Sequence, residues 1–247
     1  MSLPFSDTST FKGIIQEIER NLDMSQGDIS GDSALLKHFT ALVNLTLDDF
    51  TDLAIKSSGR WQFDDSNQTD YPIIMTNLVS GQRDYSFTTD ATGNLILDIY
   101  RVFAKNSASG VYEEIFPIDA QSDADTVGFT DGQNLTGVPY HYDKTANGIF
   151  LDPVPSYSAT SGLKVYINRE STYFTTADTT KKPGVPGDLH EYFALKPAYK
   201  YSRNKRQANT ASLANDVERM EKRIMDYYTV RAKDDRSVLK GKPFLFM

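Results

Sequence analysis

Apolar residues near the start of the chain recur with the period of an α-helix. The first stripe consists of Phe11, Ile14, Ile15, Ile18 and Leu22. Two glycines in residues 24–33 interrupt it, and a second apolar pattern then runs from Leu35 to Leu53. Ser33 is a suitable N-cap for this second helix, which is predicted to end near Ser57-Ser58-Gly59. The pattern therefore predicts two amphipathic helices before the middle of the chain.

Between Tyr71 and Arg169 the period of the apolar residues changes from the helical value to two. Short segments rich in β-branched and aromatic residues alternate with turns that contain Gly, Asn, Asp and Ser. Seven strands are predicted, in the segments YPIIMTNLV, RDYSF, LILDIYRVFA, VYEEIFPI, PYHYD, GIFLD and LKVYINRE. Seven short strands with tight turns are typical of an antiparallel sandwich or small barrel.

The strand GIFLD runs directly into two prolines, Pro153 and Pro155. Proline has no N–H for a sheet ladder and fixes its own φ angle. The strand is therefore predicted to stop at Asp152, and the prolines to keep that edge of the sheet from pairing.

The helical period returns after residue 187. Asp188 is predicted to cap a helix that carries Leu189, Tyr192, Phe193 and Leu195, with a kink or break at Pro197. A last helix is predicted from the stripe Val217, Met220, Ile224, Tyr227 and Arg231.

This order of elements predicts an α+β fold in which helices from both chain ends form a base and an antiparallel β-sandwich or barrel is inserted between them. The expected boundaries are 1–66 and 179–235 for the base and 67–178 for the inserted β-domain. Residues 236–247 lack a helical period and are expected to be an extended tail.

The charge is distributed unevenly along the chain, whose net charge is −7. Residues 1–180 hold 25 acidic and 11 basic side chains, whereas residues 181–247 hold 8 and 15. This is the pattern either of an acidic body with a basic terminal element or of two solvated surfaces of opposite sign. The chain has no cysteine, no apolar stretch that approaches the length of a membrane span, and no signal-peptide pattern at its start.

No motif in the sequence assembles catalytic chemistry. The three histidines, His38, His141 and His190, lie far apart in sequence, and ordinary packing or surface roles are expected for them. Glu113 and Glu114 are adjacent in a predicted strand and so point to opposite faces of it. The glycine patterns of phosphate loops and nucleophile elbows do not occur. We therefore predict no catalytic, cofactor-binding or metal-binding residues.

The basic C-terminal region is compatible with two interpretations. Its lysines and arginines are interleaved with Tyr192, Tyr199 and Tyr201, which is the composition of surfaces that bind single-stranded nucleic acid. The favoured interpretation is a solvated helix face whose tyrosines pack on the base. The basic residues concerned are Lys181, Lys182, Lys196, Lys200, Arg203, Lys205 and Arg206.

Several segments, taken in order, resemble a family of tailed-phage proteins. They are the stretch from RWQFDD through RDYSF, then ILDIYRVFA with YEEIFPID, then TGVPYHYD and NGIFLDPVPS with LKVYINRE, and finally KPGVPGDLHEYFAL. Together they make the chain similar to head-to-tail adaptors of the tail tubular protein A type, over about residues 11–230.

The resemblance implies a structural virion protein that is not an enzyme. Members of this family form a ring, typically of twelve copies, below the portal protein, where they extend the DNA channel and anchor other neck and tail proteins. It further implies that DNA passes through the ring without specific binding, that no membrane or cofactor is involved, and that assembly takes place in the host cytoplasm.

Two other functions remain open from the sequence. One is a virion module that binds glycans or a host surface through its β-domain, with Trp61, Tyr140 and Tyr142 as candidate stacking residues. The other is a glycan hydrolase that uses Asp64 or Asp65.

The tail is the candidate partner-binding segment, because it is apolar and basic where most chain ends are polar. It either folds back on its own subunit or inserts into the portal or a neighbouring subunit. The residues expected to make that contact are Arg236, Leu239, Lys240, Lys242, Phe244, Leu245 and Phe246.

Overall fold

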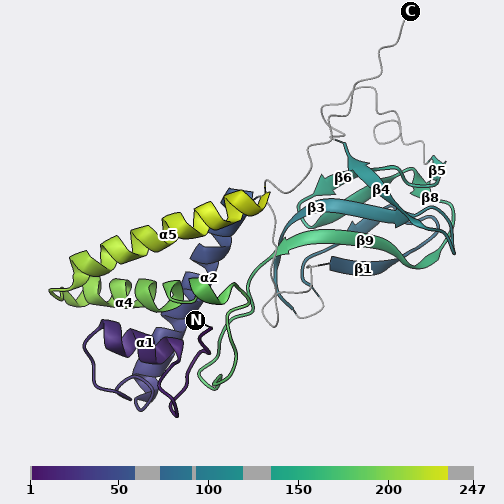
Figure 1. Cartoon of the computed structure of the whole chain (residues 1–247). Coiled ribbons are helices and arrows are strands. Elements are labelled where there is room, and N and C mark those ends of the chain that lie inside the picture. Colours follow the sequence, from purple (N-terminus) through teal and green to yellow (C-terminus); the bar gives the residue numbers. More distant parts are fainter. Residues whose placement is uncertain (1, 59–72, 91–92, 119–134, 233–247) are drawn as a thin grey trace, which may run out of the picture.

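The computed structural model describes residues 2–58, 73–90, 93–118 and 135–232. Within these ranges the protein is a mixed α and β structure with four α-helices and a large, curled, seven-stranded mixed sheet. Figure 1 shows the helices gathered on one side and the strands on the other. The predicted combination of terminal helices with strands between them is therefore confirmed.

The helices from the two ends of the chain share one buried core. They are α1 (Ile14–Asn21), α2 (Ser33–Ser58), α4 (Tyr192–Lys205) and α5 (Thr210–Ala232), and a 3-10 turn, η1 (Gly187–Leu189), precedes α4. The core contains Ile18 from α1, Phe50 from α2, Phe193 from α4 and Ile224 from α5. The apolar stripes explain this packing, because each helix presents one hydrophobic face to the others.

Two predicted helix caps are wrong. Asp32 rather than Ser33 caps α2, since its carboxylate oxygen Oδ1 accepts the backbone N–H groups of Ala34 (2.8 Å) and Leu35 (3.2 Å). Asp188 lies in η1, before the start of α4, where its carboxylate accepts a hydrogen bond from Arg223 of α5 (3.0 Å). Both residues do lie near the start of a helix. The cap of α2 is one residue earlier than predicted, and the Asp188 side chain bonds to α5 instead of capping α4.

Pro197 does not break its helix. α4 continues across it to Lys205, and Ala194, Pro197 and Ala198 are all buried. Packing of this face into the shared core compensates for the hydrogen bond that a proline cannot donate.

All seven predicted strands are present and belong to one sheet. They are β1 (Ile73–Leu78), β2 (Asp84–Ser86), β3 (Ile96–Lys105), β4 (Tyr112–Pro117), β6 (His141–Thr145), β7 (Gly148–Asp152) and β9 (Ala159–Arg169). Their order across the sheet is β1-β9-β3-β4-β6-β7-β2. A separate pair joins β5 (Thr136–Gly137) to β8 (Val154–Pro155).

The sheet curls around its own core. A single buried cluster takes residues from all seven strands, for example Val165 of β9, Val102 of β3 and Ile149 of β7. The two outermost strands, β1 and β2, are connected by only residues 79–83, and the Val79 N–H donates a hydrogen bond to the Tyr85 hydroxyl (2.9 Å). Strands on opposite sides of this curl therefore present their outer faces in different directions.

The sheet is mixed, so the prediction of a wholly antiparallel β-domain is wrong. β4 and β6 pair in parallel, with Phe116 opposite His141, and β5 pairs in parallel with β8. The chain between β4 and β6 is long, from residue 118 to 140. Parallel neighbours need such a crossover, whereas a short hairpin would have made the pair antiparallel.

The strand β7 stops at Asp152, as predicted, but the prolines do not prevent further pairing. The Asp152-Pro153 peptide is cis. The N–H of Val154 donates to the carbonyl of Leu135 (2.8 Å), and the N–H of Ser156 donates to the carbonyl of Gly137 (3.0 Å). Alternate residues of a strand point their N–H groups to the same side, so the prolines occupy the positions whose missing N–H this pairing does not use.

The segment after β9 is fixed along one face of α2. Three α2 side chains spaced four and three residues apart bond to it in turn. These contacts are Asn44 with both backbone groups of Phe174 (2.9 Å each), Asp48 with the hydroxyl of Tyr173 (2.8 Å), and Thr51 with the hydroxyl of Ser171 (3.1 Å). The chain that returns from the sheet is thus attached to the helices by side-chain hydrogen bonds.

Candidate functional site

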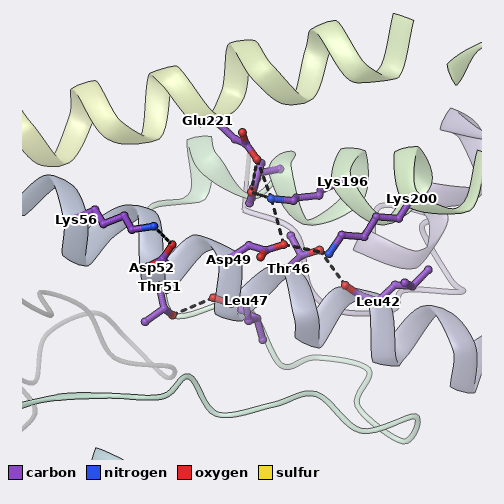
Figure 2. A network of polar contacts seen from close by, with 11 residues as sticks. Leu42, Thr46, Leu47, Asp49, Thr51, Asp52, Lys56, Lys196, Lys200 and Glu221 are labelled. Atoms are coloured by element: carbon purple, nitrogen blue, oxygen red, sulfur yellow. Dashed lines mark hydrogen bonds and ion pairs between the residues drawn. The ribbon is translucent and has the colours of Figure 1, made fainter. Parts of the chain in front are cut away.

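A network of charged side chains lies between α2, α4 and α5 (Figure 2). Asp49 of α2 forms ion pairs with Lys196 (3.1 Å) and Lys200 (3.0 Å), both from α4. Lys196 also pairs with Glu221 of α5 (2.7 Å), whose carboxylate accepts a hydrogen bond from the Tyr192 hydroxyl (3.0 Å). Two cations thus balance two carboxylates at the point where the three helices meet.

The charges in this network stabilise each other instead of being available for chemistry. Burial alone would raise the pKa of the Asp49 carboxyl, but hydrogen bonds from Lys200 and Lys196 outweigh it and lower that pKa below its ordinary value. The pKa of Tyr192 is raised, first by burial and then by the neighbouring Glu221 carboxylate. At neutral pH the first shift keeps Asp49 charged for its ion pairs, and the second keeps the Tyr192 hydroxyl protonated, so that it donates to Glu221.

This arrangement removes part of the basic C-terminal region from any nucleic-acid surface. The side chains of Lys196 and Lys200 are only 16% and 24% exposed, and Tyr192 is buried. Arg203 and Lys205 lie over the rings of Tyr199 and Tyr201, at 5.7 Å in each case. The packing of Tyr192, Tyr199 and Tyr201 on the helical core agrees with the favoured interpretation. Lys196 and Lys200 do not belong to a solvated face, because they lie in the ion-pair network.

The outer face of one half of the sheet carries basic and aromatic side chains in register, which we call the basic-aromatic surface. One row crosses β1, β9 and β3 as Met75, Lys164 and Phe103, and the next as Ile73, Tyr166 and Arg101. Lys105 and Tyr112 form a third pair between β3 and β4. Each of these residues is exposed or half-buried, and Met75 is 55% exposed.

Cation–π contacts hold the side chains of the basic-aromatic surface together. The Lys164 ammonium lies 4.2 Å from the centre of the Tyr112 ring, and the Arg101 guanidinium lies 4.8 Å from that of Phe103. Arg101 also makes a bidentate ion pair with Glu114 (2.8 and 3.0 Å). The surface therefore carries three cations against that one carboxylate, on a partly apolar background.

The other half of the sheet has an outer face of opposite sign. A single row across β6, β7 and β2 places Asp143 opposite Phe150 and Phe150 opposite Asp84. Asp84 is exposed, and Asp143 and Phe150 are half-buried. We call these three residues the acidic surface. Lys144, the next residue of β6, pairs with Asp98 of β3 (3.1 Å) instead of with either of these acids.

Neither surface was identified from the sequence, although part of the signal was present. The alternation of LKVYINR placed Lys164 and Tyr166 on one strand face, and Arg101, Phe103 and Lys105 alternate in the same way. Which strands bring these rows together depends on the register between β3 and β9, and the sequence does not reveal that register.

Most residues of the predicted partner-binding and glycan-binding sites lie outside the described residues. These are the tail contacts Arg236, Leu239, Lys240, Lys242, Phe244, Leu245 and Phe246, and the candidates Trp61, Asp64 and Asp65. Tyr140 is 52% exposed and packs edge-on against His141. Tyr142 is 1% exposed in the sheet core, so its proposed role in stacking on a glycan is wrong.

The histidines are dispersed, as expected. His38 is exposed on α2 and His141 is half-buried on β6. His190 is buried, and its Nδ1 accepts the Leu3 N–H (2.9 Å) while Nε2 lies 3.0 Å from the Val185 carbonyl. Burial lowers the pKa of His190 below its ordinary value and outweighs the neighbouring backbone groups of Val185 and Leu3, which act in the opposite direction. This histidine fastens the chain start to the helices.

A cavity of about 240 Å³ lies beside α1, lined by Phe11, Gln16, Glu19, Arg20, Met24 and Gln26. Its buried polar groups already have partners. Glu19 accepts the backbone N–H groups of Gly27 (3.1 Å) and Ile29 (2.9 Å), and Gln16 accepts that of Asp7 (2.9 Å). The polar side chains Glu19 and Gln16 in this cavity therefore hold neighbouring loops in place, and we assign the cavity no ligand.

The described part of the chain contains no cluster of three or more His, Asp or Glu side chains that could hold a metal ion. None of its helices is both long and apolar enough to span a bilayer.

Comparisons with known proteins do not assign the chain to a family. Its sequence matches no protein-family model, and no curated protein shows significant similarity to it.

Proposed function

We propose that this protein is a structural virion component of a tailed phage, a head-to-tail adaptor that forms a ring below the portal protein. The order of its elements supports this proposal most strongly. Helices from both chain ends share one core, and the strands between Ile73 and Arg169 form a separate core. In the proposed arrangement the helices are a base, and the curled sheet is a sandwich- or barrel-like domain that projects from it.

The attachment of the sheet to the helices also supports a structural role. The hydrogen bonds of Asn44, Asp48 and Thr51 hold the segment from Ser171 to Phe174 against α2. A fixed path for the chain between sheet and helices would help identical copies to make the same contacts around a ring. In this proposal the ring extends the DNA channel and binds further neck and tail proteins in the virion.

The test is the mass and shape of the purified protein, alone and mixed with the portal protein of the same phage. Light scattering and cryo-electron microscopy should show a discrete ring, of about twelve copies if this chain follows the family it resembles. A protein that stays monomeric in both conditions and does not bind portal would contradict the proposal. Retention of such a monomer on a glycan array would favour the glycan- or host-binding module instead.

A further inference from the structure

The outer face of the sheet is divided into two areas of opposite charge, and this division suggests how copies of the chain meet. The basic-aromatic surface lies on β1, β9, β3 and β4, and the acidic surface on β6, β7 and β2. These two sets of strands are the two halves of the strand order. Because the sheet curls around a single core, the two surfaces are directed to different sides of the same molecule.

The two surfaces are complementary in chemistry. Lys164 and Lys105 on one side can meet Asp143 and Asp84 on the other, and each surface carries aromatic or apolar side chains between its charges. Interfaces between subunits combine this apolar contact with opposite charges that fix the register. Since both surfaces lie on one chain but face different directions, neither can satisfy the other within the same copy.

We infer that the basic-aromatic surface of one copy binds the acidic surface of the next copy, in a heterologous contact between neighbouring sheets. A contact between two different faces of identical subunits generates a closed ring when its rotation closes. This inference rests on the proposed ring, and it names the surfaces through which the ring is held together. The occupant of each surface is therefore a second copy of this chain.

The experiment is a pair of charge reversals, Lys164→Glu and Asp143→Lys, examined by analytical ultracentrifugation and electron microscopy. In either variant alone, every interface places like charges opposite each other. Assembly of each should weaken at least about tenfold at ~0.1 M salt, where the Debye length of about 10 Å still allows short-range pairs to act. An equimolar mixture should recover assembly to within about threefold of the unmodified chain, because alternating copies place opposite charges at every interface.

Controls separate this effect from unfolding and from net charge. Both altered side chains lie on the outer face and not in the sheet core, so circular dichroism should stay unchanged. The melting temperature of Lys164→Glu should fall by only a few degrees, for the lost cation–π contact with Tyr112. Lys222→Glu and Asp226→Lys make the same changes of charge at exposed positions of α5, and should leave assembly unchanged.

The outcomes distinguish the inference from the function on which it rests. A ring that forms normally in both single reversals would overturn the inference and leave the proposed function intact. The same result together with a loss of binding to single-stranded DNA in Lys164→Glu would assign the basic-aromatic surface to nucleic acid. If the unmodified chain never assembles, alone or on portal, both the inference and the proposed function are wrong.

Discussion

Individual charged residues of α2 contribute differently to the free energy of unfolding, depending on their burial and on their ion-pair partners. Asp49 pairs with two lysines and its side chain is 40% exposed, whereas Asp52 pairs with Lys56 of the same helix, and both of these side chains are more than half exposed (59% and 69%). Exposed pairs three or four residues apart on a helix contribute little, because water screens them. Removing one partner of a more buried network leaves charges without compensation.

Asp49→Ala should therefore destabilise the protein by about 1–2 kcal/mol, a range kept low because solvent partly screens Asp49. Asp52→Ala removes the same type of side chain from the next turn of the same helix, so it is the matched control. This control should cost no more than about 0.5 kcal/mol. Urea unfolding followed by circular dichroism measures both changes. Figure 2 draws both Asp49 and Asp52. Equal losses of unfolding free energy in the two variants would show that the ion pairs of Asp49 stabilise the protein no more than the exposed pair of Asp52.

His190 makes stability depend on pH. Its folded-state pKa lies below its ordinary value of 6.5, so below about pH 6.5 the unfolded chain binds a proton more readily than the folded chain does. The free energy of unfolding should therefore fall as the pH decreases through that value. The hydrogen bond from the Leu3 N–H to Nδ1 would be lost when His190 becomes charged.

His190→Gln should remove most of the pH dependence of unfolding between about pH 5 and 7, at a cost of about 1–3 kcal/mol at neutral pH for the lost buried hydrogen bonds. His38→Gln is the control, because His38 is exposed on α2. If the slope persists in His190→Gln and disappears in His38→Gln, the assignment is wrong.

For individual residues, the sequence predicted the helical period correctly but not which side chain of the last helix is buried. Tyr227 was placed on the buried stripe of α5, but Tyr228 is fully buried and Tyr227 is 37% exposed. Steps of three and four residues both fit a helix, and the choice between them depends on the neighbour. That neighbour is Phe50 of α2, whose ring meets the Tyr228 ring edge-on at 6.0 Å.

The individual strands could be predicted, because apolar and polar residues alternate along each of them. The order in which the strands pair could not be predicted. Pairing of β9 with both β1 and β3 joins segments far apart in sequence. The parallel contact of β4 with β6 depends on the path of the chain between them. The rows of charge on the outer face follow from this register, so the sequence could supply their residues but not their grouping.

The separation into two cores predicts that the helices fold without the sheet. Replacing residues 73–169 by a short Gly-Ser linker should leave a soluble helical product, because the helical core contains no residue from any strand. The segment from Ser171 to Phe174 is retained in this design, since Phe174 stacks on Phe5 with ring centres 4.7 Å apart. Far-ultraviolet circular dichroism and a cooperative thermal transition measure the outcome. A product without helical signal would show that the helices need the sheet.

A second form of the same design provides the control. Extending the deletion through Phe174 removes a core residue together with the hydrogen bonds to Asn44 and Asp48. This longer deletion should be less stable than the shorter one by several kcal/mol, in line with the loss of a large buried aromatic side chain.

For the whole molecule, the proposed function depends on contacts with other chains, and the tail provides the clearest test of them. Residues 236–247 lie outside the described residues, and the prediction rests on their composition. Phe244, Leu245 and Phe246 could each contribute roughly 1.5–3 kcal/mol if buried against a partner, before the cost of ordering the segment. The lysines nearby would then face acidic groups of that partner.

Ending the chain after Ser237 should therefore leave a folded subunit, with an unchanged melting temperature, that fails to join the portal or ring. A full-length variant with Phe244, Leu245 and Phe246 all changed to Ser keeps the length and charge of the tail and should show the same defect. Reversing only Lys240 and Lys242 to Glu should weaken binding less and make it depend on salt in the opposite sense. Sedimentation with purified portal measures all three. If the truncated chain binds portal with unchanged affinity, the tail is not the partner-binding segment. The surfaces of the sheet and helices must then make that contact.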